Sequence, residues 1–217
     1  MPQLTYNPAV FNVPDMRTAM QIILTAETWT TERRWEVETP YLAELIGQSI
    51  VITSDTVLLD YGCGVGRLAK ELIARYNCRV VGLDISASMR ALAPIYVQSD
   101  RFLSCSPVML ETLAGRGVRF DAAIAIWVLQ HCVRPAEDIA TLQQLLKADA
   151  LLFVVNSTYR AVPVIEHPWI NDGIDIKQML SEEFTLERDG ALAPDKVPQP
   201  LAGRTFWAAL SNRRPIP

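Results

Sequence analysis

A glycine-rich turn lies between two acidic residues, and its spacing could hold a nucleoside. The turn reads Asp60-Tyr61-Gly62-Cys63-Gly64-Val65-Gly66 and follows an apolar run, while Asp84 ends a second apolar run. Glycine permits positive φ and leaves no Cβ between backbone and ligand, so a flat or charged ligand can approach closely. The helix expected behind the turn presents unpaired N–H groups that favour a carboxylate or phosphate. The segment therefore predicts a strand-turn-helix-strand unit for a nucleoside.

Two classes of cofactor use such a turn. The run from Gly64 to Ala69 satisfies the dinucleotide pattern G-x-G-x-x-A, with Asp84 at a tolerable distance for an acid that binds ribose. Asp60 favours the other class, because a carboxylate at the mouth of the turn would repel a pyrophosphate. It would instead suit an ammonium group, such as that of S-adenosylmethionine. An NAD-binding oxidoreductase is the alternative.

The pattern apolar-apolar-Asp-x-Gly-x-Gly-x-Gly resembles the signature of class I S-adenosylmethionine-dependent methyltransferases of the small-molecule type. The resemblance runs from about Thr56 to Ser211. It includes Gly82–Met89, which resembles the segment that binds ribose and adenine, and Phe120–His131, which resembles the segment beneath the methionine portion. It implies S-adenosylmethionine as cofactor, S-adenosylhomocysteine as product, and these cofactor-binding residues: Asp60, Gly62, Cys63, Gly64, Gly66, Asp84, Ile85, Met89, Ser106, Pro107, Ile126 and Trp127.

One departure from the family concerns the adenine. The third strand of the family commonly ends in an acid that binds the adenine amino group, whereas Cys105-Ser106-Pro107 stands here. Ser106 or a backbone group is expected to serve instead.

The acceptor side is expected where the fourth strand ends. His131 is the candidate general base, needed if an acceptor hydroxyl must lose its proton; the alternative is that it hydrogen-bonds locally and orders its loop. The candidate substrate-contacting residues are Trp29, Trp35, His131, Tyr159 and His167. No metal site is expected, because the four cysteines are far apart and the chain has two histidines.

Short apolar runs alternate with helical patterns from residue 56 onward. Strands are predicted at 56–60, 79–84, 101–105, 120–126, 150–156, 184–188 and 205–211, and helices at 66–76, 86–97, 108–115, 135–147 and about 174–182. This order predicts an α/β, Rossmann-like, doubly wound sheet of seven strands. The last strand is expected to be antiparallel, because no crossover helix precedes it. The loops 157–173 and 189–204 should emerge at the carboxyl edge of the sheet, where ligands bind.

The first fifty residues predict a helical cap or lid (1–50) before the cofactor-binding domain (51–217). Asp15 and Thr39-Pro40 are expected to start helices. The segment from Trp29 to Trp35 is either a surface helix or a substrate-facing lid. In the helix at 66–76, the charged side chains Arg67, Lys70, Glu71 and Arg75 are expected on a solvated face.

The composition of the chain limits the kinds of molecule that it is expected to bind. The chain has 217 residues, with 20 basic and 24 acidic side chains and a formal net charge of −4. It has no basic run for nucleic acid and no apolar stretch of the roughly 18 residues that a membrane helix needs. We expect a cytoplasmic monomer or homodimer that methylates a small molecule by in-line displacement. The alternatives are a methyltransferase for protein or RNA, and a fold relative that binds the cofactor without transfer.

Overall fold

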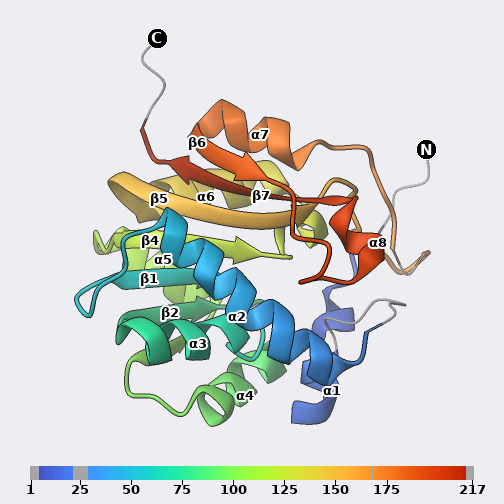
Figure 1. Cartoon of the computed structure of the whole chain (residues 1–217), viewed down its shortest axis with the longest axis horizontal. Coiled ribbons are helices and arrows are strands. Elements are labelled where there is room, and N and C mark those ends of the chain that lie inside the picture. The colour runs from blue at the N-terminus through green and yellow to red at the C-terminus, as the bar shows by residue number, and fades with distance from the viewer. Residues whose placement is uncertain (1–4, 22–28, 168, 214–217) are drawn as a thin grey trace.

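The structure is a computed structural model that describes residues 5–21, 29–167 and 169–213. A seven-stranded sheet forms its centre (Figure 1). The strands are β1 (Val57–Tyr61), β2 (Arg79–Leu83), β3 (Phe102–Cys105), β4 (Phe120–Ile126), β5 (Leu146–Ser157), β6 (Thr185–Gly190) and β7 (Thr205–Ser211). The helices are η1 (Pro8–Phe11), α1 (Met16–Gln21), α2 (Thr31–Ser49), α3 (Arg67–Tyr76), α4 (Ala87–Val97), α5 (Pro107–Gly115), η2 (Leu129–His131), α6 (Pro135–Leu145), α7 (Ile176–Glu183) and α8 (Gln199–Ala202).

The strand order is β3-β2-β1-β4-β5-β7-β6. β7 lies between β5 and β6 and runs antiparallel to both, while the pairs among β1 to β5 are parallel. The predicted fold class and the antiparallel last strand are therefore confirmed. The connection before β7 contains the four-residue helix α8, which is too short to act as a crossover.

Helices cover both faces of the sheet. Successive residues of a strand point to opposite faces, so Leu58 packs with α2 and α3 while Leu59 packs with α5, α6 and α7. In Figure 1, α2 and α3 lie in front of the sheet, and α6 lies behind it. This double cover explains why residues 122–126 of β4 and 150–155 of β5 are continuously apolar.

The boundary between α6 and β5 differs from the prediction. The helix was expected to reach 147 and the strand to begin at 150, but α6 ends at Leu145 and β5 begins at Leu146. Leu146 is buried and pairs with Phe120 across an irregularity in the ladder, and Asp149 has a positive φ of 62°. Pairing with β4 therefore overrides the local helical pattern.

The N-terminal helices confirm one expected start and correct another. Asp15 accepts a hydrogen bond from the amide of Thr18 (2.8 Å) just before α1, but the apolar positions Ile23 and Leu24 lie outside the described residues. Thr39-Pro40 does not begin a helix, since α2 begins at Thr31 and contains Pro40. The proline removes one backbone hydrogen bond, but tertiary contacts of the preceding turns, described below, hold the helix together.

Segment Trp29–Trp35 thus leads into the first turns of α2. The hydroxyl of Thr30 caps this helix by accepting from the amide of Arg33 (3.2 Å). Buried side chains of α2, such as Leu42 and Ile46, join the same apolar cluster as the strands. None of the described helices is long and apolar enough to cross a membrane.

Candidate functional site

A cavity of about 1240 Å³ opens at the carboxyl edge of the sheet. The ends of β1, β2 and β4 meet there with the beginning of α2, as expected for a doubly wound sheet. The expected site residues on its wall are Trp35, Asp60, Gly62, Cys63, Gly64, Asp84, Ile85, Met89, Pro107, Ile126, Trp127, His131 and Tyr159. Most of the predicted cofactor-binding residues are therefore brought together in one space.

The glycine turn is fastened to the end of β2. The carbonyl of Leu83 accepts from the amides of Gly62 and Cys63, each at 2.8 Å. The carboxylate of Asp84 accepts from the amide of Gly64 at one oxygen and from that of Ser86 at the other, both at 2.8 Å. Burial raises the pKa of Asp84, against the effect of these two amides. A Cβ added to Gly64, whose φ is 55°, would meet no atom within 4 Å, so the turn leaves room for a ligand.

Asp60 is a buried carboxylate with an unsatisfied atom. Its side chain is 3% exposed, and Oδ2 has no hydrogen-bond partner among the described residues. Burial and the nearby charge of Asp84 raise its pKa to about 7, against the effect of Arg67. Buried polar atoms nearly always have a partner. An ammonium group in the cavity would supply one, so this side chain fits the amino-acid end of S-adenosylmethionine.

A buried ion cluster joins α2, α3 and the end of β4. Glu38 is fully buried and accepts from Arg34 (2.6 Å), from Arg67 (3.0 Å) and from the indole of Trp127 (3.1 Å). Burial raises the pKa of Glu38, but the two arginines outweigh it and hold the pKa below its ordinary value. Both arginines line the cavity.

Arg67 corrects a prediction, because it is 8% exposed and does not lie on a solvated face. Lys70 is exposed, and Glu71 and Arg75 are partly exposed and paired with each other at 2.6 Å, as expected. Arg34, Glu38 and Arg67 were missed as site residues. Arg34 and Glu38 are four residues apart, a spacing that predicts an ion pair on one face of a helix. The pairing of Glu38 with Arg67 could not be predicted in this way, because the two residues lie in different helices.

His131 stands at the other end of the cavity. Its Nδ1 is 2.6 Å from the carbonyl oxygen of Ala161, and its Nε2 is 3.1 Å from the side-chain nitrogen of Gln130. The rings of Phe11 and Trp169 flank it, with centroid separations of 5.7 and 5.3 Å. Burial lowers the pKa of His131 and the charge of Arg160 lowers it further, against the effect of the bond to Ala161. The imidazole is therefore neutral at physiological pH and lies in an aromatic environment.

Residues 5–13, which we call the N-terminal strap, lie along the cavity. At one end Tyr6 forms an antiparallel bridge with Val164. At the other end the amide of Val13 donates to the hydroxyl of Ser88 (2.9 Å) at the beginning of α4. Tyr6, Val10 and Phe11 contribute to the cavity wall. No local sequence pattern marks these residues, since their position depends on contacts with distant loops.

Four of the expected site residues lie away from the cavity wall. Gly66 caps α3 in the left-handed conformation, and a Cβ there would meet Val97 at 2.5 Å. Ser106 caps α5 by accepting from the amide of Met109 (3.2 Å). Trp29 stacks under Arg33, with 4.4 Å between the guanidinium carbon and the ring centroid, and His167 is exposed in its loop.

Known methyltransferases are similar to this chain in sequence and in fold. A family model described as a methyltransferase domain matches residues 59–154. The ubiquinone biosynthesis O-methyltransferase of Methylobacterium sp. (strain 4-46) is 30% identical over 168 residues, which are 70% of this chain and 66% of that protein. The protein of the same name from Bartonella quintana (strain Toulouse) is 33% identical over 107 residues, or 48% of this chain and 43% of that one.

A similar solved structure is the geranyl diphosphate C-methyltransferase from Streptomyces coelicolor A3(2), in complex with Mg2+, geranyl diphosphate and S-adenosyl-L-homocysteine. The TM-score is 0.64 at 14% identity, covering 96% of this chain and 89% of that one, which shows a shared fold. The chain spans from under half to about two thirds of the length of these two curated relatives. The matched domain, the sequence relatives and the strand order together show that the chain belongs to the class I S-adenosylmethionine-dependent methyltransferases.

Proposed function

We propose that this protein transfers the methyl group of S-adenosylmethionine to a hydroxyl group of a small-molecule acceptor. The observation that carries the proposal is the continuity of one cavity from Asp60 to His131. The same space thus holds a buried carboxylate suited to the donor and a neutral imidazole suited to an acceptor.

The donor would lie along the ends of β1, β2 and β4. Asp84 would bind the ribose hydroxyls and Asp60 the ammonium group, while the carboxylate of the cofactor would meet the guanidinium groups of Arg34 and Arg67. Ile85, Met89 and Pro107 would flank the adenine, and Ile126 and Trp127 would lie beneath the methionine portion. The hydroxyl of Ser106 already caps α5, so its backbone rather than its side chain would bind the adenine.

S-adenosylmethionine supplies an electrophilic methyl group, and in-line displacement requires the acceptor to be collinear with it. The chain contributes alignment and exclusion of water, which can lower the barrier by up to about 7–11 kcal/mol. Phe11, Trp169 and the N-terminal strap would exclude water from the acceptor side. Tyr159 would line its edge, since it contributes to the cavity wall. Trp35 also lines the cavity but packs in the cluster of Met89, so it would lie on the cofactor side.

His131 would act as the general base. The carbonyl of Ala161 can only accept, so Nδ1 carries the hydrogen and Nε2 carries the lone pair. An acceptor hydroxyl would replace the Gln130 amide at Nε2 and transfer its proton there. The relatives named O-methyltransferases support oxygen as the methylated atom. The net charge of −4 and the concave shape of the cavity favour a small molecule over RNA or a protein.

The first test is binding of the cofactor product. S-adenosylhomocysteine should raise the melting temperature and NADH should not; the reverse result would contradict the proposal. The second test screens hydroxylated metabolites with labelled S-adenosylmethionine. With an acceptor in hand, His131→Ala should lower kcat by about 100-fold or more, the ordinary contribution of a general base. Unchanged turnover at saturating acceptor would exclude the base role of His131 and leave the methyltransferase proposal intact.

A further inference from the structure

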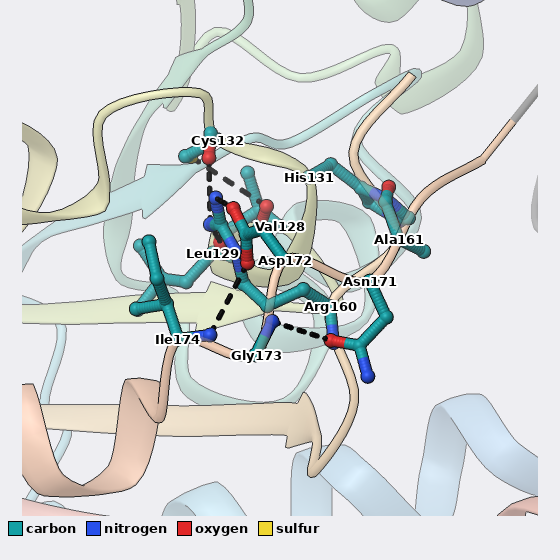
Figure 2. A network of polar contacts seen from close by, with 10 residues as sticks. All are labelled: Val128, Leu129, His131, Cys132, Arg160, Ala161, Asn171, Asp172, Gly173 and Ile174. Carbon is teal, nitrogen blue, oxygen red and sulfur yellow. Dashed lines mark hydrogen bonds and ion pairs between the residues drawn. The ribbon is translucent and has the colours of Figure 1, made fainter. Parts of the chain in front are cut away.

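The loop after β5 holds His131 through a single buried arginine. Arg160 is 3% exposed and forms a two-bond ion pair with Asp172, with Nε–Oδ1 at 3.0 Å and Nη2–Oδ2 at 2.9 Å. Its remaining nitrogen, Nη1, donates to the carbonyls of Leu129 (3.2 Å) and Cys132 (2.6 Å). Figure 2 shows the guanidinium between Asp172 and the backbone of η2.

These hydrogen bonds hold the backbone on both sides of His131. Nη1 binds the carbonyl two residues before His131 and the carbonyl just after it. The residue next to Arg160, Ala161, accepts from Nδ1 of the imidazole and donates its own amide to the carbonyl of Gln130 (3.0 Å). One side chain and the adjacent peptide thus fix both the backbone and the ring of His131.

The opposite ring nitrogen is also defined. The amide of Ser157 donates to Oε1 of Gln130 (2.7 Å), so the NH₂ group of Gln130 faces Nε2 of His131. Nε2 therefore accepts, and the imidazole is the neutral Nδ1–H tautomer.

Asp172 is itself held in place. Its Oδ1 accepts from the amide of Ile174 (3.2 Å), while the neighbouring Asn171 accepts from the amides of Arg160 (3.3 Å) and Gly173 (3.1 Å). The bond to Arg160 is the largest of the effects that lower the pKa of Asp172, so the pair is ionised at neutral pH. Bidentate contacts of this kind give geometric precision that a lysine ammonium cannot reproduce.

We propose that Arg160 is a positioning residue, which together with Asp172 sets the tautomer and direction of the His131 imidazole toward the acceptor. The catalytic consequence rests on the proposed function, whereas the tautomer can be measured without it. Arg160→Lys keeps the charge but loses the fork, and Asp172→Asn keeps an oxygen acceptor but loses the ion pair. If the guanidinium fork is what matters, both variants should disturb His131.

The experiment is NMR of the full chain with isotope-labelled histidine. The chain has two histidines, and His167→Gln assigns the second signal. We expect the Nδ1–H tautomer in the unmodified protein and a mixture of tautomers in Arg160→Lys and Asp172→Asn. Arg213→Lys is the matched control, because Arg213 pairs with Asp149 (3.0 Å) at the opposite edge of the sheet. An unchanged tautomer in both folded variants would overturn the proposal.

With an acceptor in hand, the same variants give a kinetic readout. Arg160→Lys should lower kcat by about tenfold or more and move the acidic limb of the pH profile of kcat, with little change in the KM for S-adenosylmethionine. A changed tautomer in Arg160→Lys, together with an unchanged kcat in both Arg160→Lys and His131→Ala, would support positioning and overturn the base role. A Lys variant with wild-type tautomer and pH profile would overturn positioning while leaving the base role intact.

Discussion

The indole of Trp127 donates a hydrogen bond to Glu38 over 3.1 Å, although 89 residues separate the two. This bond fastens the helix that precedes the sheet to the end of β4. Because Glu38 also accepts from Arg34 and Arg67, one carboxylate is the shared partner of two buried positive charges.

We expect Glu38→Gln to lower the free energy of unfolding by about 3–5 kcal/mol, because it leaves two buried guanidinium groups without their shared carboxylate. Urea unfolding at neutral pH measures the effect. Glu71→Gln is the control, since Glu71 pairs with Arg75 at 2.6 Å on a partly exposed face and should cost less than about 1 kcal/mol. Equal losses in the two variants would show that Glu38 has no special role.

Asp60 should make cofactor binding depend on pH. Its pKa is raised to about 7, and a bound ammonium group would lower it, so binding below pH 7 must release a proton. We expect the affinity for S-adenosylhomocysteine to rise up to about tenfold per pH unit below 7 and to level off above it. Calorimetry in buffers of different ionisation heat counts the released proton. Asp60→Asn should bind more weakly and release none, and a wild-type protein that also releases none would exclude this role.

The same carboxylate should reduce the stability of the ligand-free chain. The pKa is higher in the folded state than in the unfolded state, so stability falls as the pH rises from about 4 to 7. Asp60→Asn should therefore raise the free energy of unfolding by about 4 kcal/mol above pH 7 and by about 1–2 kcal/mol near pH 5. A gain that does not depend on pH would contradict the titration of Asp60.

Asp84→Ala should weaken the binding of S-adenosylhomocysteine by roughly 10- to 150-fold, equivalent to about 1.5–3 kcal/mol for a hydrogen bond to a charged group. The amide of Gly64 would also lose its partner. Asp55→Ala, at an exposed position before β1, serves as the control. Calorimetry that finds the same affinity in both variants would remove Asp84 from the site.

Gly62 and Gly173 have nearly equal φ, so a comparison of their alanine variants distinguishes the cost of backbone strain from that of steric conflict. A Cβ at Gly62 (φ 78°) would lie 2.4 Å from the Val128 side chain, whereas one at Gly173 (φ 79°) would meet nothing within 4 Å. Gly173→Ala should cost about 1–2 kcal/mol for the left-handed backbone alone. Gly62→Ala should cost a further 1–3 kcal/mol or so for overpacking, as measured by urea unfolding. Equal costs would show that Val128 moves aside freely.

The sheet could be predicted because its information is local. Apolar runs, helical stripes and the missing crossover before β7 each lie within a few residues of the element that they specify. Thr39-Pro40 misled for the opposite reason, since a local start signal lies inside a helix that Arg34 and Glu38 hold together. In the same way Arg67 looks solvated on a helical wheel, and its burial depends on a carboxylate 29 residues away.

Part of the candidate site shares this limit. The positions of Asp60 and Asp84 follow from the ends of strands, and strand ends are visible in the sequence. Phe11 and Trp169 meet around His131 only because two distant segments cross the same edge, with 6.2 Å between their ring centroids. Nothing in the sequence around Arg160 indicates which carbonyl groups its side chain binds.

The N-terminal strap connects the two ends of the cavity, because the same segment contacts both. It is bonded to Ser88 beside the end proposed for the nucleoside and to Val164 beside the end proposed for the acceptor. If a ligand moves the strap when it enters or leaves at one end, the contact at the other end moves with it. We expect the enzyme to follow a compulsory order of binding and release, in which the product that departs first frees the exit of the second.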